Sequence, residues 1–60
     1  MTAPFSVWFN AIGVIVKKAT GIPIEDCPDQ AYREMYDYDW TPEQVAKLVI
    51  QDLYRYLGVN

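Results

Sequence analysis

Carboxylates are the residues of this sequence with the clearest capacity for chemistry, and they gather in the middle of the chain. Residues 25–43 carry seven acids against one base, whereas the rest of the chain carries one acid against four bases. Such a cluster can bind calcium, exchange protons as an acid–base pair or contact a basic partner. A calcium-loop register that begins at Asp37 places Pro42 and Leu48 where the loop requires glycine and glutamate. The spacing therefore does not fit a calcium loop of this type.

Catalysis by these carboxylates lacks supporting groups, although their spacing alone leaves a carboxylate pair possible. The sequence has no histidine, no nucleophile beside a base and no glycine-rich phosphate loop. Cys27 is the only cysteine, so an internal disulfide is impossible and structural zinc is disfavoured. We therefore predict no enzymatic activity, no cofactor and no metal.

Most of the acids also have local structural roles. Asp26 and Asp29 are expected to cap a helix, and Glu43 to interact with the dipole of the next helix. Asp37 and Asp39 fall in the turn between these helices, which capping does not fully explain. The alternative to purely local roles is a surface that docks a basic partner, and we expect such a surface at this turn.

Charge and composition disfavour several classes of partner. With five basic residues and no basic stripe, the chain lacks the electrostatic drive for nucleic-acid binding. A nucleic-acid mimic is a weaker alternative, because mimics carry a higher density of acids. The longest apolar stretch, within residues 4–16, is interrupted by polar residues and is shorter than the roughly 20 residues that span a bilayer. A free cysteine and the lack of a secretory leader pattern predict a cytoplasmic protein without membrane partners.

Residues 3–19 are predicted to form the first of three helices. Thr2 is the expected N-cap, Pro4 is tolerated in the first turn, and Gly21 is expected to end the helix. Apolar residues recur on one helical face, the pattern of an amphipathic helix. This face consists of Phe5, Trp8, Phe9, Ile12, Ile15, Val16 and Ala19.

Residues 42–57 are predicted to form the last helix. The sequence "TPEQ" forms a capping box with Thr41 at the N-cap and Gln44 at N3. Trp40 is expected to pack on Val45 as a hydrophobic staple, and Gly58 should close the helix. The expected apolar face consists of Val45, Ala46, Val49, Ile50, Leu53, Tyr56 and Leu57.

A short middle helix is predicted over residues 28–37, with Asp26 as its cap and Pro28 in its first turn. Tyr32, Met35 and Tyr36 are spaced to form its buried side. Short loops between antiparallel neighbours then imply one compact, all-α, three-helix domain over residues 1–60.

Tyrosines are abundant and divide into two expected groups. Tyr32, Tyr36 and Tyr56 are expected mostly in the core, because a chain of 60 residues must build its core partly from aromatics. Tyr38 and Tyr54 are expected at an interface.

Several apolar residues fall outside the expected core. Val7, Ala11 and Val14 form a stripe on a flank of the first helix, and Leu48 stands on the polar side of the last. The stripe is either buried against another chain, self or foreign, or part of a wider intramolecular face. Cys27 is expected to behave as a small apolar residue that is buried or half-buried.

The ordered set T20-G21, D26-x-P28-D29-x-x-Y32-x-x-x-Y36 and T41-P42-x-x-x-A46 resembles a group of short, uncharacterised helical proteins of bacteria, plasmids and phages. The resemblance covers residues 20–46 and rests on helix punctuation. Cys27 replaces the usual leucine, and Asp39 or Trp40 stands near the group's usual glycine. The resemblance implies a small cytoplasmic accessory protein, of mobile-element origin, whose work is binding.

These observations predict a protein-binding module, a phage or mobile-element accessory that engages a host protein through an acidic, tyrosine-rich surface. The alternative is a structural domain that self-associates as a homodimer through the first helix. The predicted contact residues are Val7, Ala11, Val14, Glu34, Asp37, Tyr38, Asp39, Leu48 and Tyr54.

Overall fold

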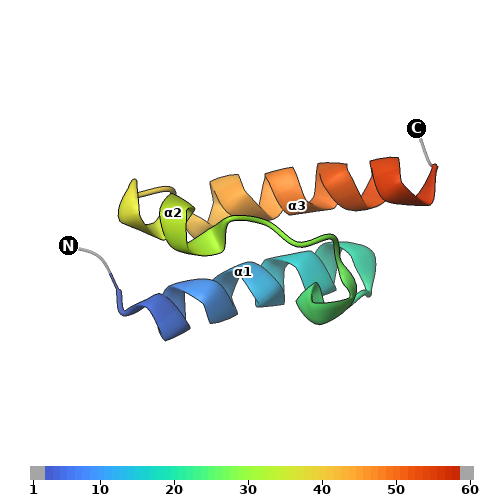
Figure 1. The fold of residues 1–60 in the computed structure, drawn as a ribbon. Coiled ribbons are helices and arrows are strands. Elements are labelled where there is room, and N and C mark those ends of the chain that lie inside the picture. Colours follow the sequence, from blue (N-terminus) through green and yellow to red (C-terminus); the bar gives the residue numbers. More distant parts are fainter. Residues whose placement is uncertain (1–2, 59–60) are drawn as a thin grey trace.

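The computed structural model describes residues 3–58, and over that range it contains three α-helices and one short 3₁₀ helix (Figure 1). In chain order these are α1 (Phe5–Thr20), the 3₁₀ helix η1 (Ile24–Asp26), α2 (Tyr32–Asp37) and α3 (Pro42–Leu57). The prediction of an all-α, three-helix domain is confirmed.

Helix α3 begins and ends where its sequence signals predict. Thr41 Oγ1 accepts a hydrogen bond from Gln44 N at 3.2 Å, and Gln44 Oε1 accepts one from Thr41 N at 3.0 Å. These two bonds form the predicted capping box, which satisfies backbone donors that a helix start leaves unpaired. Gly58 closes the helix with φ 76°, a left-handed conformation that costs glycine little.

Helix α1 runs from Phe5 to Thr20, close to the predicted 3–19. Pro4 occupies the N-cap position, and the predicted cap Thr2 lies outside the described residues. Gly21 ends the helix as predicted, with φ 76° and its N–H bonded to Lys17 O at 2.7 Å.

Helices α1 and α3 pack together and run in the same direction (Figure 1). Their N-terminal ends are joined by a hydrogen bond of 2.8 Å from Trp8 Nε1 to Trp40 O. Helix α2 runs in the opposite direction to both, so successive helices are antiparallel, as predicted (Figure 1). The irregular segment 27–31 carries the chain back along both long helices before α2 begins.

The middle helix is shorter than the predicted 28–37, because the chain before it is held out of helical conformation. Asp26 ends η1 instead of capping α2, whose N-cap position is Ala31, without a side-chain capping bond. The predicted capping roles of Asp26 and Asp29 are thus wrong. Cys27 is extended (φ −91°, ψ 159°), the conformation favoured directly before a proline.

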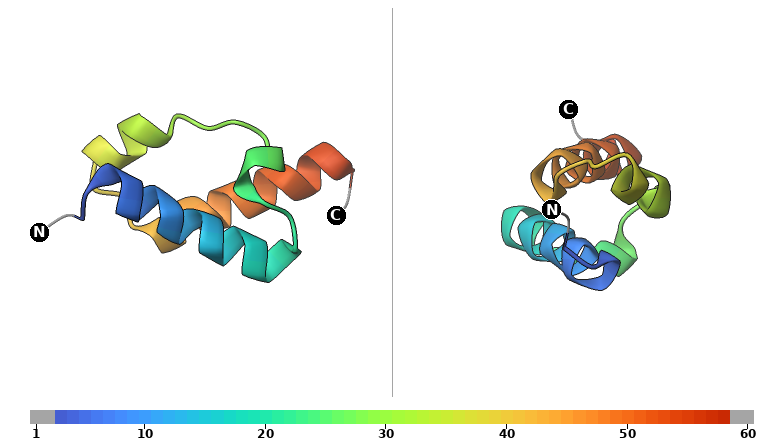
Figure 2. Two further views of the ribbon diagram at one scale, coloured as in Figure 1. Left: turned by 90° about the horizontal axis from the view of Figure 1, so that it is seen from below. Right: turned by 90° about the vertical axis from the view of Figure 1, so that its left-hand side faces the viewer.

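Gln30 fixes this crossover segment against α3. Its side-chain amide Nε2 donates a hydrogen bond to the Asp52 carboxylate in the middle of α3. As a result η1 and α2 lie on one side of the α1–α3 pair (Figure 2).

The core forms between the two long helices. Tyr32, Met35 and Tyr36 are half-buried against it, as predicted. The buried apolar residues are Trp8, Ile12 and Val16 from α1, and Val45, Ala46, Val49 and Leu53 from α3.

The last turn of α3 departs from the predicted core. Tyr56 is 77% exposed and Leu57 is 53% exposed. The prediction that Tyr56 belongs mostly to the core is therefore wrong. Helix α3 extends beyond the end of α1, so these side chains have no opposing element in the described chain (Figure 1).

Candidate functional site

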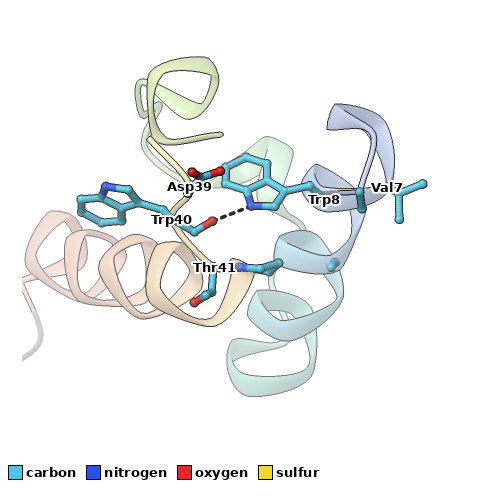
Figure 3. Close-up of a pocket in the computed structure, with 8 residues that line it drawn as sticks. Val7, Trp8, Asp39, Trp40 and Thr41 are labelled. Atoms are coloured by element: carbon cyan, nitrogen blue, oxygen red, sulfur yellow. Dashed lines mark hydrogen bonds between the residues drawn. The ribbon is translucent and has the colours of Figure 1, made fainter. Parts of the chain in front are cut away.

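An open groove of about 480 Å³ lies between the first half of α1 and the turn that joins α2 to α3 (Figure 3). Its volume falls in the range of roughly 300–1,000 Å³ that is usual for ligand pockets. We call it the Trp40 groove. Its lining residues are Ala3, Val7, Trp8, Ala11, Asp39, Trp40, Thr41 and Pro42.

The turn that forms one wall of the groove has a defined backbone geometry. Asp39 adopts φ 62°, the left-handed conformation. The N–H of Asp39 donates to Tyr36 O at 3.1 Å, and the N–H of Trp40 donates to Met35 O at 3.0 Å. This pair of bonds is the Schellman motif, in which the left-handed residue is usually glycine and sometimes asparagine. The motif turns the chain sharply from α2 into the N-cap of α3.

Trp8 connects this turn to α1. Its ring is buried, with 4% exposed, and its Nε1–H reaches the main-chain carbonyl of Trp40. The Trp40 side chain is 39% exposed and points away from the Trp8 ring (Figure 3). Trp8 therefore fixes the wall through the Trp40 main chain, and Trp40 lines the groove with its ring directed away from Trp8 (Figure 3).

Aromatic contacts support the groove from the α2 side. The Tyr36 ring lies 5.3 Å from both the Phe5 and Trp8 rings in edge-on geometry, and its hydroxyl donates to Ala3 O at 2.6 Å. The Arg33 guanidinium lies 5.3 Å from the centre of the Phe5 ring. Each aromatic pair contributes about 0.5–1.5 kcal/mol beyond buried area, so the first turn of α1 is well anchored.

The chain around the groove is acidic. Residues 34–43 contain four acids and no base, and all four acids are exposed. Asp37 lies 3.5 Å from Arg33 one helical turn before it, in a pair whose side chains are 71% and 59% exposed. Solvent weakens such a pair, so the negative potential at this end of the molecule persists.

The structure brings some predicted contact residues together and separates others. Val7, Ala11 and Asp39 line the Trp40 groove. Val14 instead lines a second hollow of about 280 Å³ beside η1, so the predicted stripe is divided between two sites. Leu48, predicted on the polar side of α3, is half-buried and lines neither hollow.

The remaining predicted contact residues lie outside the groove lining. Tyr38 and Tyr54, predicted at an interface, are 77% and 41% exposed. Glu34 and Asp37 are exposed on α2, close in sequence to the wall.

Trp40 is one of five lining residues that were not among the predicted contact residues, with Ala3, Trp8, Thr41 and Pro42. Its position directly before the N-cap supplied a local explanation, the staple with Val45. An aromatic residue next to an acidic turn could have indicated a contact surface, because aromatics are enriched at interface centres.

Two groups with raised pKa values lie outside the groove lining, Cys27 in the crossover segment and Tyr32 at the start of α2. Burial raises the pKa of the Cys27 thiol, and Asp26 and Glu25 add to this effect. Cys27 is half-buried against the core, as predicted, and its Sγ lies 3.5 Å from Pro23 O. The thiol is therefore held protonated, the opposite of what a nucleophile requires.

The Tyr32 hydroxyl is the second of these groups. Burial, and then the neighbouring Cys27 and Asp29, raise the pKa of Tyr32 to about 12. Its oxygen is buried without a hydrogen-bond partner in the described part of the chain.

Within residues 3–58, no group of three Cys, His, Asp or Glu side chains is placed to hold a metal ion. Over the same range, no helix has the length and apolar character needed to cross a membrane. Comparisons with family models, curated proteins and solved structures found no match to this chain.

Proposed function

We propose that this chain is a small protein-binding module whose contact surface is the Trp40 groove and the acidic turn beside it. The observation that carries the proposal is that apolar residues of α1 and the α2–α3 turn, far apart in sequence, meet in one open groove. A concave site lined mostly by apolar residues with a few polar groups is the usual form of a binding site.

The alternatives receive less support. The site contains no histidine or thiol beside the carboxylate of Asp39, so it offers no general base paired with a nucleophile. The exposed acids repel phosphate, which argues against nucleic acid. A protein partner can contact the apolar lining of the groove and the exposed acids beside it.

A narrower proposal follows from the resemblance of residues 20–46 to short proteins of plasmids and phages. We infer a cytoplasmic accessory protein of a mobile element that engages a host protein. The binding surface is the same in either form of the proposal.

Capture from bacterial lysate tests this function with a matched pair of variants. Val7 and Val14 are 56% and 57% exposed on the same helix, but only Val7 lines the Trp40 groove. We expect a protein that wild type and Val14→Gln retain and that Val7→Gln loses. Equal retention by all three chains would exclude the groove as the contact surface.

A homodimer through α1 is the second candidate function. It is favoured by the exposure of both Val7 and Val14, which lie on a flank of α1 away from its buried face. Sedimentation equilibrium tests it directly. A dimer that both Val7→Gln and Val14→Gln weaken would support it, and a strict monomer at high concentration would eliminate it.

A further inference from the structure

The chemical character of the Trp40 groove restricts what can fill it. Its floor and walls are apolar apart from two residues, Asp39 and Thr41. Its α1 side spans residues 7–11, about one helical turn or roughly 6 Å, and Ala3 adds to it just before the helix begins. This length accommodates one or two large apolar side chains from a single short segment of a partner.

Charge further selects the partner. The four exposed acids of residues 34–43 stand within a few residues of the lining. A second copy docked groove to groove around a two-fold axis would bring both acidic turns together, and like charges at an interface oppose binding. A foreign segment with lysine or arginine beside its apolar anchor meets the complementary potential.

The backbone of the turn indicates the partner's secondary structure. The N–H groups of Asp39 and Trp40 bond to α2 carbonyls, and the N–H of Thr41 bonds to Gln44 Oε1. The carbonyl of Trp40 already accepts the bond from Trp8. An extended peptide therefore finds no row of unpaired backbone groups to join, whereas a helix satisfies its own backbone and needs only side-chain contacts.

We propose that the Trp40 groove binds a basic amphipathic helix of another protein. One large apolar side chain of that helix contacts Val7 and Ala11, and a lysine or arginine one turn away faces the acidic residues of the stretch 34–43. This inference rests on the proposed function and names the class of partner that the same site recognises.

Two synthetic helices provide the probe. Each has about 15 residues, long enough for marginal helicity, with leucines at helical spacing on one face. The other face carries lysine and alanine in the first peptide, and glutamate and alanine in the second. Neither contains an aromatic residue, so the tryptophan fluorescence of the full chain reports binding.

We expect the lysine peptide to bind and to shift the emission, and the glutamate peptide to bind at least about tenfold more weakly. Val7→Gln should weaken binding of the lysine peptide about tenfold or more, because it places an amide against the anchor. Val14→Gln should change binding by less than about twofold, because Val14 lies outside the groove.

A second matched pair tests the charge. Asp39→Asn removes one carboxylate and keeps a residue type that tolerates the left-handed backbone at φ 62°. Glu25→Gln removes one exposed carboxylate from η1, at the opposite end of the molecule from α2 (Figure 1). We expect Asp39→Asn to weaken binding about two- to fivefold and Glu25→Gln to have little effect, as for exposed ion pairs.

Four outcomes would overturn the inference. These are equal binding of the two peptides, equal effects of Val7→Gln and Val14→Gln, equal effects of the two charge variants, and a dimer of the free chain that Val7→Gln alone dissociates. If capture of the lysate protein requires Val7 but the lysine peptide does not bind, the basic amphipathic helix is the wrong class of partner and the protein-binding function stands. If neither ligand depends on Val7, both proposals fail.

Discussion

Replacing Trp8 with phenylalanine tests the bond that joins the α2–α3 turn to α1. The substitution removes the Nε1–H that donates to Trp40 O at 2.8 Å and shrinks a side chain that is only 4% exposed. The lost hydrogen bond costs about 1 kcal/mol net, and the lost packing costs roughly 1–2 kcal/mol more. We therefore expect Trp8→Phe to lower the free energy of unfolding by about 2–3 kcal/mol.

Trp40→Phe is the matched control, because the acceptor is the main-chain carbonyl of residue 40 and survives the change. Its side chain is 39% exposed, so less than about 1 kcal/mol should be lost. Urea unfolding followed by far-UV circular dichroism measures both variants. In thermal melts, Trp8→Phe should lower Tm by roughly 10–20 °C. A loss from Trp8→Phe no larger than that from Trp40→Phe would refute the role of this bond.

Substitutions at four further positions test the fold. Thr41→Ala removes the capping box and should cost about 1 kcal/mol in urea unfolding, whereas Thr41→Ser should cost much less; equal losses would contradict the capping role. Gly13→Ala should stabilise α1 by up to about 1 kcal/mol, because the added Cβ meets Ile24 Cγ2 at an ordinary 3.4 Å. Gly21→Ala should destabilise the folded chain by about 1 kcal/mol, because Gly21 has a φ of 76°, which alanine adopts only with strain. Thermal melts in which Gly13→Ala lowers Tm more than Gly21→Ala would contradict both expectations. The pKa of Tyr32, raised to about 12, makes the folded state retain a proton that the unfolded state releases near pH 10. The contribution of Tyr32 to the free energy of unfolding is therefore complete below pH 10 and is lost as pH rises towards 12. The free energy of unfolding of Tyr32→Phe should depend less on pH in this alkaline range. An unchanged pH dependence would refute the raised pKa of Tyr32.

The parts of the fold that the sequence predicted are those set by neighbouring residues. The bounds of α3 follow from Thr41, Gln44 and Gly58, each of which acts within one helical turn. Helix α1 follows from its apolar periodicity and from Gly21. Both kinds of signal are local, so one sequence is sufficient to interpret them.

The parts that the sequence did not predict depend on distant contacts. The contacts that hold α1 and the crossover segment against the α3 side include the bonds Trp8–Trp40 and Gln30–Asp52, which join residues 32 and 22 positions apart. Periodicity places Tyr56 on the apolar face of α3, but it cannot tell that α1 ends before reaching it.

The candidate site was predicted in pieces. The sequence indicated Val7 and Ala11 as one surface and Asp39 as another, on different elements. Their meeting in one groove follows from the parallel packing of α1 and α3, which brings both helix starts to the same end of the molecule. Trp40 joins them there through its place in the Schellman turn.

The most direct test of the central claim compares Val7→Gln with Val14→Gln in binding the partner captured from lysate. The two positions share a residue type, a helix and an exposed fraction near one half, and differ in whether they line the Trp40 groove. We predict that Val7→Gln raises the Kd about tenfold or more, while Val14→Gln changes it by less than about twofold. Equal Kd values for the two variants would contradict the assignment of the groove as the binding site.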